Sequence, residues 1–324
     1  MFLSSRARRG TMGGEQPPLR GIIGACLTPF GDDGSVDHQA LGRQIEFLVE
    51  DVDAVAVAAV EASEWRMLGD AARRDLLRAG VELVGGRVPA IAGATADSVE
   101  GVLRWIEFAH SVGADLAQVL MPARPWSGEP GPSELVRFFE AVASRTPLPL
   151  AVYHNPGSGA DPDVATYVAI SEIPQVACFK ESSRDIAKIL RLIQEIDLAG
   201  RAAYFTTMQP LLTTLLMGGS GATMPPPATR IAARVRDAVA ASDLDTAVRW
   251  QQVFSVFPAP WSRFGLTPVM KAAMGHAGIP MGAPASPYQP LDAASDQRLR
   301  RFIQGCGLLD GGVPSSEQLR ALAA

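Results

Sequence analysis

Short apolar runs alternate with longer amphipathic segments from Leu19 to Ala285. A short apolar run bounded by polar turns predicts a buried strand, and apolar residues three and four apart predict a helix. The expected strands are Gly21–Leu27, Ala54–Ala59, Pro89–Ala92, Leu116–Met121, Leu148–Val152, Gln175–Phe179, Ala202–Thr206 and Gly221–Met224. The expected helices lie near Asp37–Glu50, Ala71–Val84, Ser98–Ser111, Ser133–Ser144, Pro162–Ser171, Arg184–Ile196 and Pro210–Leu216.

This alternation predicts a parallel α/β sheet closed into a (β/α)8 TIM barrel. An open, doubly wound sheet is the alternative, and the lack of a GxGxxG motif after the first apolar run counts against it. Four further helical segments follow the eighth run, and they exceed what a barrel needs. They predict a C-terminal helical layer or an oligomer surface, and they lie near Ala228–Ala241, Leu244–Ala259, Thr267–Ala277 and Asp292–Gln304.

The chain is therefore expected to have three regions. Residues 1–18 are expected to form a disordered extension, residues 19–225 the barrel, and residues 226–324 a C-terminal helical domain. In that last region Trp250, Phe254, Phe257 and Trp261 fall at helical spacing, which is typical of core packing.

Composition narrows the class of protein. Hydrophobic residues make up 47% of the chain and charged residues 19%, as in globular proteins. The net charge of −5 without a basic block argues against nucleic acid as a partner, and no apolar run is long enough to span a membrane. Three widely spaced cysteines indicate reduced thiols in a cytoplasmic protein, and four scattered histidines show no metal-ligand spacing.

Lys180 ends an apolar run and needs an explanation, because burying an ammonium group is costly. Desolvation would lower its pKa from about 10.4 and free the amine to form a Schiff base with a carbonyl substrate. The alternative is a surface lysine paired with Glu181. Tyr153 ends the preceding run, and a phenol beside an amine suits the proton transfers of Schiff-base formation. This pairing favours the catalytic interpretation.

In a TIM barrel the active site lies at the carboxyl ends of the strands. The residues that follow the apolar runs are therefore candidates. They are Thr28, Glu61 with Ser63 and Glu64, Thr95, Arg124, Tyr153 with His154 and Asn155, Lys180 with Glu181, and Thr206 to Met208.

A series of motifs extends from Gly21 to about Leu291. They are Leu27-Thr28-Pro29-Phe30, Asp32–Asp37, Glu64 with Leu68, Val88–Gly93, Pro147–Leu150, Tyr153 with Pro156, Phe179-Lys180-Glu181, Gly218–Ala222 and Pro268–Ala273. In order and spacing they resemble the dihydrodipicolinate synthase and N-acetylneuraminate lyase family of class I, lysine-dependent aldolases. The resemblance implies a barrel with a C-terminal helical domain, a dimer or tetramer, Lys180 as the Schiff-base lysine and Tyr153 as its proton shuttle.

The chain departs from this family after the second strand. Where the family has Gly-Thr-Thr-Gly-Glu, this chain has Val60-Glu61-Ala62-Ser63-Glu64. By the resemblance, Glu61 replaces the relay threonine and Ala62 the threonine that holds the pyruvate carboxylate. Backbone donors near Ala62 and Ser63 are still expected to bind a carboxylate.

Arg124 is a second departure, because it replaces the tyrosine that completes the family's proton relay from a neighbouring subunit. We expect Glu61 and Arg124 to meet beside Tyr153, with Glu61 acting as acid and base. In the alternative, Glu61 points into solvent and Arg124 binds a substrate carboxylate.

The remaining departures concern the substrate. Ser158 replaces an arginine that helps the synthases bind aspartate semialdehyde, which argues against a true dihydrodipicolinate synthase. The order Tyr153-x-Asn155-Pro156 is similar to that of the hydratase-aldolases that cleave aromatic ylidene-pyruvates. An apolar pocket is also expected, and the residues that suggest it are Thr206, Met208 and Met224, with Trp65 and Trp126 near the rim.

The predicted function is a Schiff-base lyase or aldolase that acts on a 2-oxo acid of the pyruvate type with an aldehyde partner, apolar or aromatic in character. No cofactor is implied, because the protonated imine is itself the electron sink. A lysine-dependent dehydratase or decarboxylase, and a catalytically silent oxo-acid-binding barrel, are the alternatives. The catalytic set is Lys180, Tyr153 and Glu61, and the expected binding residues are Ala62, Ser63, Arg124, His154, Asn155, Thr206 and Thr223.

Overall fold

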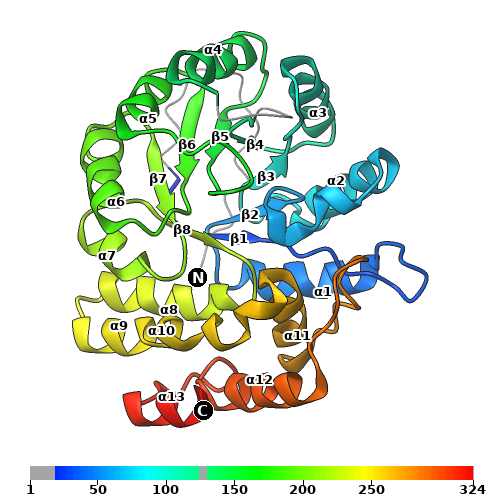
Figure 1. Cartoon of the computed structure of the whole chain (residues 1–324), viewed down its shortest axis with the longest axis vertical. Coiled ribbons are helices and arrows are strands. Elements are labelled where there is room, and N and C mark those ends of the chain that lie inside the picture. Colours follow the sequence, from blue (N-terminus) through cyan, green and yellow to red (C-terminus); the bar gives the residue numbers. More distant parts are fainter. Residues whose placement is uncertain (1–18, 124–129, 324) are drawn as a thin grey trace, which may run out of the picture.

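The computed structural model describes residues 19–123 and 130–323, and parallel strands form a closed barrel at its centre (Figure 1). Each strand pairs with the next along the chain, and β8 pairs back onto β1. The strands are β1 (Gly21–Ala25), β2 (Ala54–Val57), β3 (Ala90–Gly93), β4 (Leu116–Leu120), β5 (Leu150–Tyr153), β6 (Val176–Lys180), β7 (Ala203–Thr206) and β8 (Gly221–Met224). The predicted (β/α)8 barrel is confirmed.

Helices alternate with the strands and cover the outside of the barrel (Figure 1). They are α1 (His38–Val49), α2 (Asp70–Val84), α3 (Val99–Ser111), α4 (Pro132–Ala143), α5 (Val164–Ser171), α6 (Ile186–Leu192), α7 (Leu211–Leu216) and α8 (Ala228–Ala240). Several begin at an aspartate or serine whose side chain accepts backbone N–H groups of the first turn, a preferred N-cap. Among these caps are Asp37, Ser98, Asp163 and Asp185.

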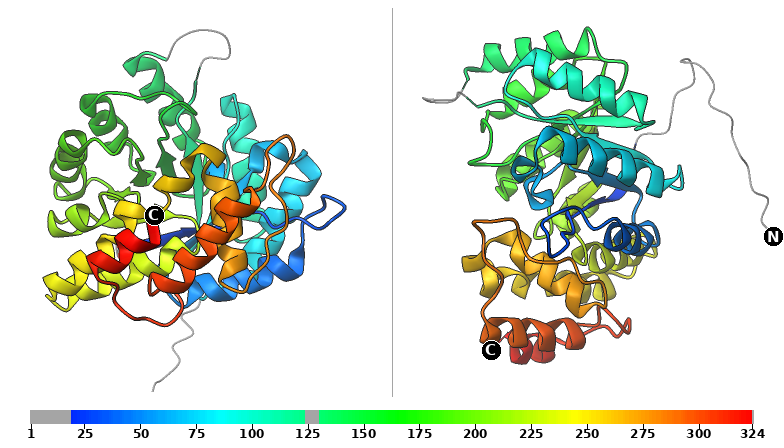
Figure 2. Two further views of the ribbon diagram at one scale, coloured as in Figure 1. Left: turned by 60° about the horizontal axis from the view of Figure 1, so that its bottom comes forward. Right: turned by 90° about the vertical axis from the view of Figure 1, so that its right-hand side faces the viewer.

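The C-terminal helices pack along the side of the barrel formed by α8 (Figures 1 and 2). They are α9 (Leu244–Gln251), α10 (Val253–Val256), the 3₁₀ turn η4 (Ala259–Phe264), α11 (Leu266–His276), α12 (Ala293–Gly305) and α13 (Ser316–Ala323). The expected single helix over residues 244–259 is interrupted at Gln252, and its second part ends at Val256, shortly before Pro258, which cannot donate a backbone hydrogen bond. Trp250, Phe254, Phe257 and Trp261 are buried, as their spacing predicted.

α8 packs against β1, β8 and α7 and so completes the barrel's alternation of strand and helix. The boundary expected at residue 225 would separate this helix from the strands that it covers. We propose a limit after Ala240 instead, with α9 as the first element of the C-terminal region.

The interior of the barrel is filled by small, aliphatic and aromatic side chains, among them Ile23, Ala56, Ala151, Cys178 and Phe205. Side chains of a strand alternate between its two faces. Tyr153 therefore points inward like Ala151, and Lys180 points inward like Cys178. Both end their strands, and they are paired neighbours in the β5–β6 register, so the two functional groups meet at the carboxyl end of the barrel.

Candidate functional site

Lys180 and Tyr153 line one small cavity of about 80 Å³ at the carboxyl end of the barrel. The Nζ atom of Lys180 lies 4.2 Å from the centre of the Tyr153 ring. The other lining residues are Ala25, Val60, Glu61, Ala62, Asn155, Ser182, Arg184, Thr207, Met208, Thr223, Met224, Pro225 and Leu266. The residues predicted to be catalytic are thus brought together.

The Lys180 amine has a lowered pKa of about 7. Burial is the main cause, and the positive charge of Arg184 adds to it, while Glu61 and Glu181 act in the opposite direction. Nζ also hydrogen-bonds the hydroxyl of Ser182, two residues along the chain. An amine in this environment is held in place and is substantially unprotonated at neutral pH.

Glu61 meets Tyr153 directly. The phenol donates a hydrogen bond of 2.6 Å to Glu61 Oε2, and Asn155 Nδ2 donates to the same oxygen at 3.4 Å. The other oxygen, Oε1, lies 3.8 Å from Nε of Arg66. Burial, together with the negative charge of Glu61, raises the pKa of Tyr153, so the phenol keeps its proton and remains a donor.

The turn that carries Glu61 is fixed at both ends. Glu61–Ser63 forms a 3₁₀ turn directly after β2, and the hydroxyl of Thr28 donates to the carbonyl of Ser63. Glu64 ends the turn with a positive φ of 53°. Its buried carboxylate forms an ion pair of 2.6 Å with Lys271 of α11 and accepts the backbone N–H of Ala285 at 2.6 Å. The turn that carries Glu61 is therefore anchored to the C-terminal region.

The predicted binding residues fall into two groups. Ala62, Asn155 and Thr223 line the cavity, and within the described part of the chain the buried Thr223 hydroxyl has no hydrogen-bond partner. Ser63 and Thr206 do not line it. The Ser63 hydroxyl donates to the carbonyl of Val60 at 2.5 Å, and Thr206 is fully buried.

Arg124 and Trp126 lie outside the described residues. The expected pair of Glu61 with Arg124 therefore stays a prediction. The alternative in which Glu61 points into solvent does not match its contact with Tyr153, because that hydrogen bond turns the carboxylate into the cavity.

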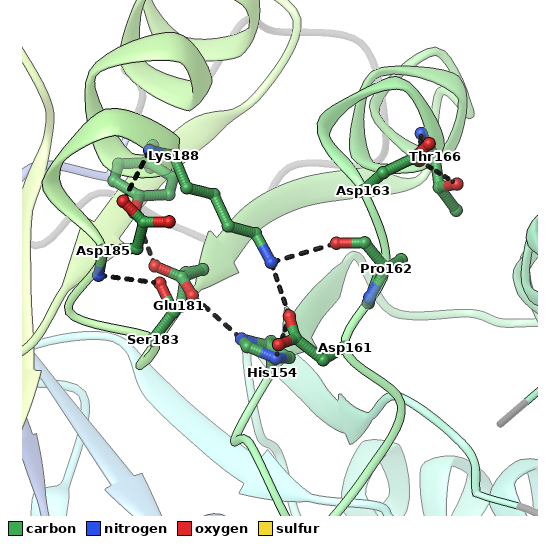
Figure 3. Close-up of polar contacts among 10 residues, drawn as sticks. His154, Asp161, Pro162, Asp163, Thr166, Glu181, Ser183, Asp185 and Lys188 are labelled. Atoms are coloured by element: carbon green, nitrogen blue, oxygen red, sulfur yellow. Dashed lines mark hydrogen bonds and ion pairs between the residues drawn. The ribbon is translucent and has the colours of Figure 1, made fainter. Parts of the chain in front are cut away.

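His154 lies outside the cavity, and a direct substrate contact through it does not fit the structure. It follows the inward-pointing Tyr153, so the alternation of strand side chains turns it outward. The ring is fully buried, with Nδ1 2.9 Å from Glu181 Oε1 and Nε2 3.1 Å from Asp161 Oδ1 (Figure 3). Lys188 of α6 also contacts Asp161, at 2.5 Å.

Glu181 is the centre of this buried network (Figure 3). Burial alone would raise its pKa, but hydrogen bonds from His154 and Ser183, with the charge of His154, lower the pKa to about 2. Tyr204 of β7 donates to the second carboxylate oxygen at 2.9 Å. Glu181 is thus an ionised group that joins β5, β6 and β7, and it pairs with His154 instead of Lys180.

Several cavity residues were absent from the predicted binding set, among them Ser182, Arg184 and Leu266. Ser182 and Arg184 lie in the loop after β6, where no periodicity indicates which side chains turn inward. Leu266 begins α11, far from the barrel strands in sequence. The Phe179-Lys180-Glu181 motif was the nearest signal for Ser182, since the serine lies two residues after the lysine.

Two further observations concern metals and membranes. In residues 19–123 and 130–323 no group of three or more histidine, cysteine, aspartate or glutamate side chains is arranged to hold a metal ion. None of the helices described in those residues combines the length and the apolar character needed to cross a bilayer.

Comparisons with known proteins agree on one family. A model of the dihydrodipicolinate synthetase family matches residues 18–305. A 4-hydroxy-tetrahydrodipicolinate synthase from Methylibium petroleiphilum is 28% identical over 307 residues, covering 90% of this chain and 99% of the relative. An uncharacterized DapA-like lyase from Rhizobium meliloti is 27% identical over 294 residues, covering 88% of this chain and 95% of the relative.

Solved structures share the fold. YagE, a prophage protein from E. coli K12 solved in complex with pyruvate, is 23% identical with a TM-score of 0.80, covering 89% of this chain and 99% of its own. A dihydrodipicolinate synthase from Thermotoga maritima is 23% identical with a TM-score of 0.82, covering 90% and 99%. With the family match over most of its length, the chain belongs to the dihydrodipicolinate synthetase family of aldolase-type lyases.

Proposed function

We propose that this protein forms a Schiff base between Lys180 and the carbonyl carbon of a 2-oxo acid of the pyruvate type, and joins it to or releases it from an aldehyde. The observation that carries the proposal is the Lys180 amine, which has a pKa of about 7 and lies beside Tyr153. An unprotonated amine in a confined cavity is the nucleophile that this chemistry needs.

In the proposed reaction the Lys180 nitrogen attacks the ketone carbon, and the ketone oxygen takes up a proton to give a carbinolamine. Tyr153 protonates the carbinolamine hydroxyl, water leaves, the nitrogen lone pair forms the iminium, and a proton from solvent returns through Glu61 to the Tyr153 phenolate. When an aldol is cleaved, its hydroxyl loses a proton, the C–C bond breaks, and the electron pair moves onto the iminium as an enamine. The aldehyde is then released.

Glu61 completes the proton path. As Tyr153 takes the aldol proton, its own proton passes along the 2.6 Å hydrogen bond to the Glu61 carboxylate. The Glu61 side chain is 27% exposed, so it can exchange that proton with solvent. A carboxylate in this place supports the proposal that Glu61 replaces the threonine relay of the family.

The carboxylate of the 2-oxo acid needs a different binding group from the family's threonine, which Ala62 replaces here. The N–H of Ser63 already donates to the carbonyl of Val60 at 3.0 Å. The hydroxyl of Thr223 lines the cavity from β8, and we assign it, with the backbone near Ala62, to the carboxylate of the 2-oxo acid.

The aldehyde is proposed to be apolar or aromatic rather than aspartate semialdehyde. Apolar side chains line much of the cavity, among them Val60, Met208, Met224 and Leu266. Ser158, at the position of the synthases' arginine, offers only a hydroxyl, which accepts from Asn155 at 3.4 Å. A true dihydrodipicolinate synthase is therefore not the proposed activity.

A dehydratase or decarboxylase of an oxo acid is the second candidate. The hydrogen bond between Tyr153 and Glu61 favours this activity as well. Loss of water next to the iminium needs an acid, and Glu61 can return a proton to Tyr153 after each transfer. In both cases we propose a cytoplasmic homo-oligomer, a dimer or tetramer, as the family resemblance implies.

Borohydride trapping tests the Schiff base. The protein is incubated with pyruvate and other 2-oxo acids, reduced, and analysed by intact mass and peptide mapping. We expect an adduct on Lys180, none in Lys180→Met, and imine formation slower by about 100-fold or more in Tyr153→Phe. If a folded protein gave no adduct with any of the acids, it would be an oxo-acid-binding barrel without this chemistry.

A further inference from the structure

A second, larger cavity of about 440 Å³ adjoins the lysine cavity. Five residues line both, so the two spaces lie next to each other. They are Glu61, Ala62, Asn155, Arg184 and Leu266. The remaining wall consists of Glu64, Trp65, Arg66, Met67, Phe264, Gly265, Thr267, Pro268 and Tyr288. A molecule in the larger cavity therefore lies beside the space that Lys180 lines.

The wall of this cavity exposes large apolar side chains. Met67 is 40% exposed, Leu266 38% and Tyr288 57%, although residues of this kind are normally covered. They come from three separate segments of the chain and, with Trp65 and Phe264, surround one space. A bound apolar or aromatic group would cover this surface and gain the free energy of removing it from water.

Arg184 is the cation at the junction of the two cavities. Its φ is +63°, in the left-handed region that a residue other than glycine occupies only at a cost. Its Nε donates to Gln209 Oε1 at 2.9 Å, and in the described part of the chain it makes no ion pair. Backbone strain of this kind is concentrated at functional sites. Because the strained residue lies between the two cavities and carries a guanidinium, its charge is expected to have a function.

Arg66, on the same cavity, differs from Arg184. Its Nε lies 3.8 Å from Glu61, and its guanidinium stacks 4.3 Å above the Trp65 ring. The Glu61 carboxylate therefore offsets the charge of Arg66. Arg184 is left as the side chain best placed to hold an anion next to the lysine cavity.

We propose that the larger cavity is the subsite of the aldehyde partner, and that this aldehyde carries an anionic group that binds Arg184 on an apolar, aromatic-sized body. The inference rests on the proposed function, since the aldehyde carbon must face the enamine on Lys180. In the joining direction the enamine carbon attacks the aldehyde carbon, Tyr153 protonates the aldehyde oxygen, and water hydrolyses the iminium to free Lys180.

Two aldehydes that differ only in charge test this subsite. With the 2-oxo acid that traps on Lys180 as donor, kcat/KM is measured for benzaldehyde and for 4-formylbenzoate. An arginine–carboxylate contact predicts that wild type prefers 4-formylbenzoate by about 10- to 100-fold. The ratio of the two values cancels any change in lysine reactivity, because both aldehydes meet the same enamine.

Arg184→Gly is the informative variant, because glycine accepts the positive φ without strain while the guanidinium is lost. We expect it to lose the preference for 4-formylbenzoate, measured as the ratio of the two kcat/KM values. Arg184→Lys should retain part of the preference, and Arg191→Met, at an exposed ion pair on α6, should leave it unchanged. Tyr288→Ala should reduce kcat/KM for both aldehydes alike.

The outcomes separate the two proposals. Equal use of both aldehydes by wild type, or an unchanged preference in Arg184→Gly, would overturn the anionic subsite while trapping on Lys180 still upholds the Schiff base. A failure of trapping would instead overturn the proposed function.

Discussion

At the scale of single residues, charges of opposite sign on either side of the cavity act on the Lys180 amine. Glu61 favours the ammonium form and raises the pKa, whereas Arg184 favours the amine and lowers it. Burial is the larger effect and sets the pKa at about 7. Substitution of Glu61 or Arg184 should therefore change the pKa of the lysine amine without a change at Lys180 itself.

The pH dependence of imine formation should report these charges. The reactive form is the free amine, so the rate should rise with pH and level off above about 7. Glu61→Gln removes a charge that raises the pKa, so the inflection should move to lower pH. Arg184→Gly removes a charge that lowers the pKa, so the inflection should move to higher pH. Single-turnover trapping measures both, and displacement of the two variants in the same direction would contradict this assignment.

At the scale of elements, β5 and β6 are joined twice, once on each face. On the inner face Tyr153 and Lys180 are register partners, and on the outer face His154 and Glu181 form a buried pair (Figure 3). The outer pair fixes the relative position of the two strand ends. It therefore positions Tyr153 and Lys180, the proposed reacting groups, from outside the cavity.

Glu181→Gln should destabilise the protein at neutral pH by about 1.5 to 3 kcal/mol, because it removes the carboxylate that the buried donors of His154, Ser183 and Tyr204 share. The folded-state pKa of Glu181, about 2, is below the ordinary value of 4.5. Its contribution is therefore complete above about 4.5 and is lost as pH falls towards 2. The difference in free energy of unfolding between wild type and variant, measured in urea at several pH values, should shrink over that window.

Glu195→Gln, at an exposed ion pair with Arg191, is the control and should cost less than about 1 kcal/mol at any pH. The effects of His154→Gln and Glu181→Gln should be less than additive in the double variant. A constant difference from pH 7 to pH 3 would show that Glu181 is not held ionised.

The strands and loops also explain which residues of the site could be predicted from the sequence and which could not. Apolar runs located every strand, and because Tyr153 and Lys180 each end a run, their meeting was predictable from the barrel rule. His154 was assigned to the substrate because it follows Tyr153, yet the two-residue period of a strand turns neighbours to opposite faces. Arg184 lies in a loop without periodicity, and Leu266 reaches the cavity only through tertiary packing, so neither had a local signal.

At the scale of the whole molecule, the C-terminal region takes part in the site. α11 begins with Leu266 in the cavity wall, and its Lys271 holds Glu64, three residues after Glu61. The Thr267 hydroxyl also contacts the carbonyl of Ala62 at 3.5 Å. The helices beside the barrel in Figure 2 thus position the turn that carries the proposed acid and base.

Lys271→Met tests this coupling, because it leaves the Glu64 carboxylate buried without its cation. Removing one partner of a buried ion pair costs about 3 to 5 kcal/mol, so the free energy of unfolding should fall by that amount. The anchored turn should also loosen, and single-turnover imine formation should slow in protein that is still folded.

The double variant Glu64→Gln/Lys271→Met removes both charges and should recover part of the stability and of the rate. Arg263→Met, at an exposed ion pair with Asp292, should change neither. An unchanged rate of imine formation in folded Lys271→Met would show that the ion pair supports the fold alone and does not position Glu61.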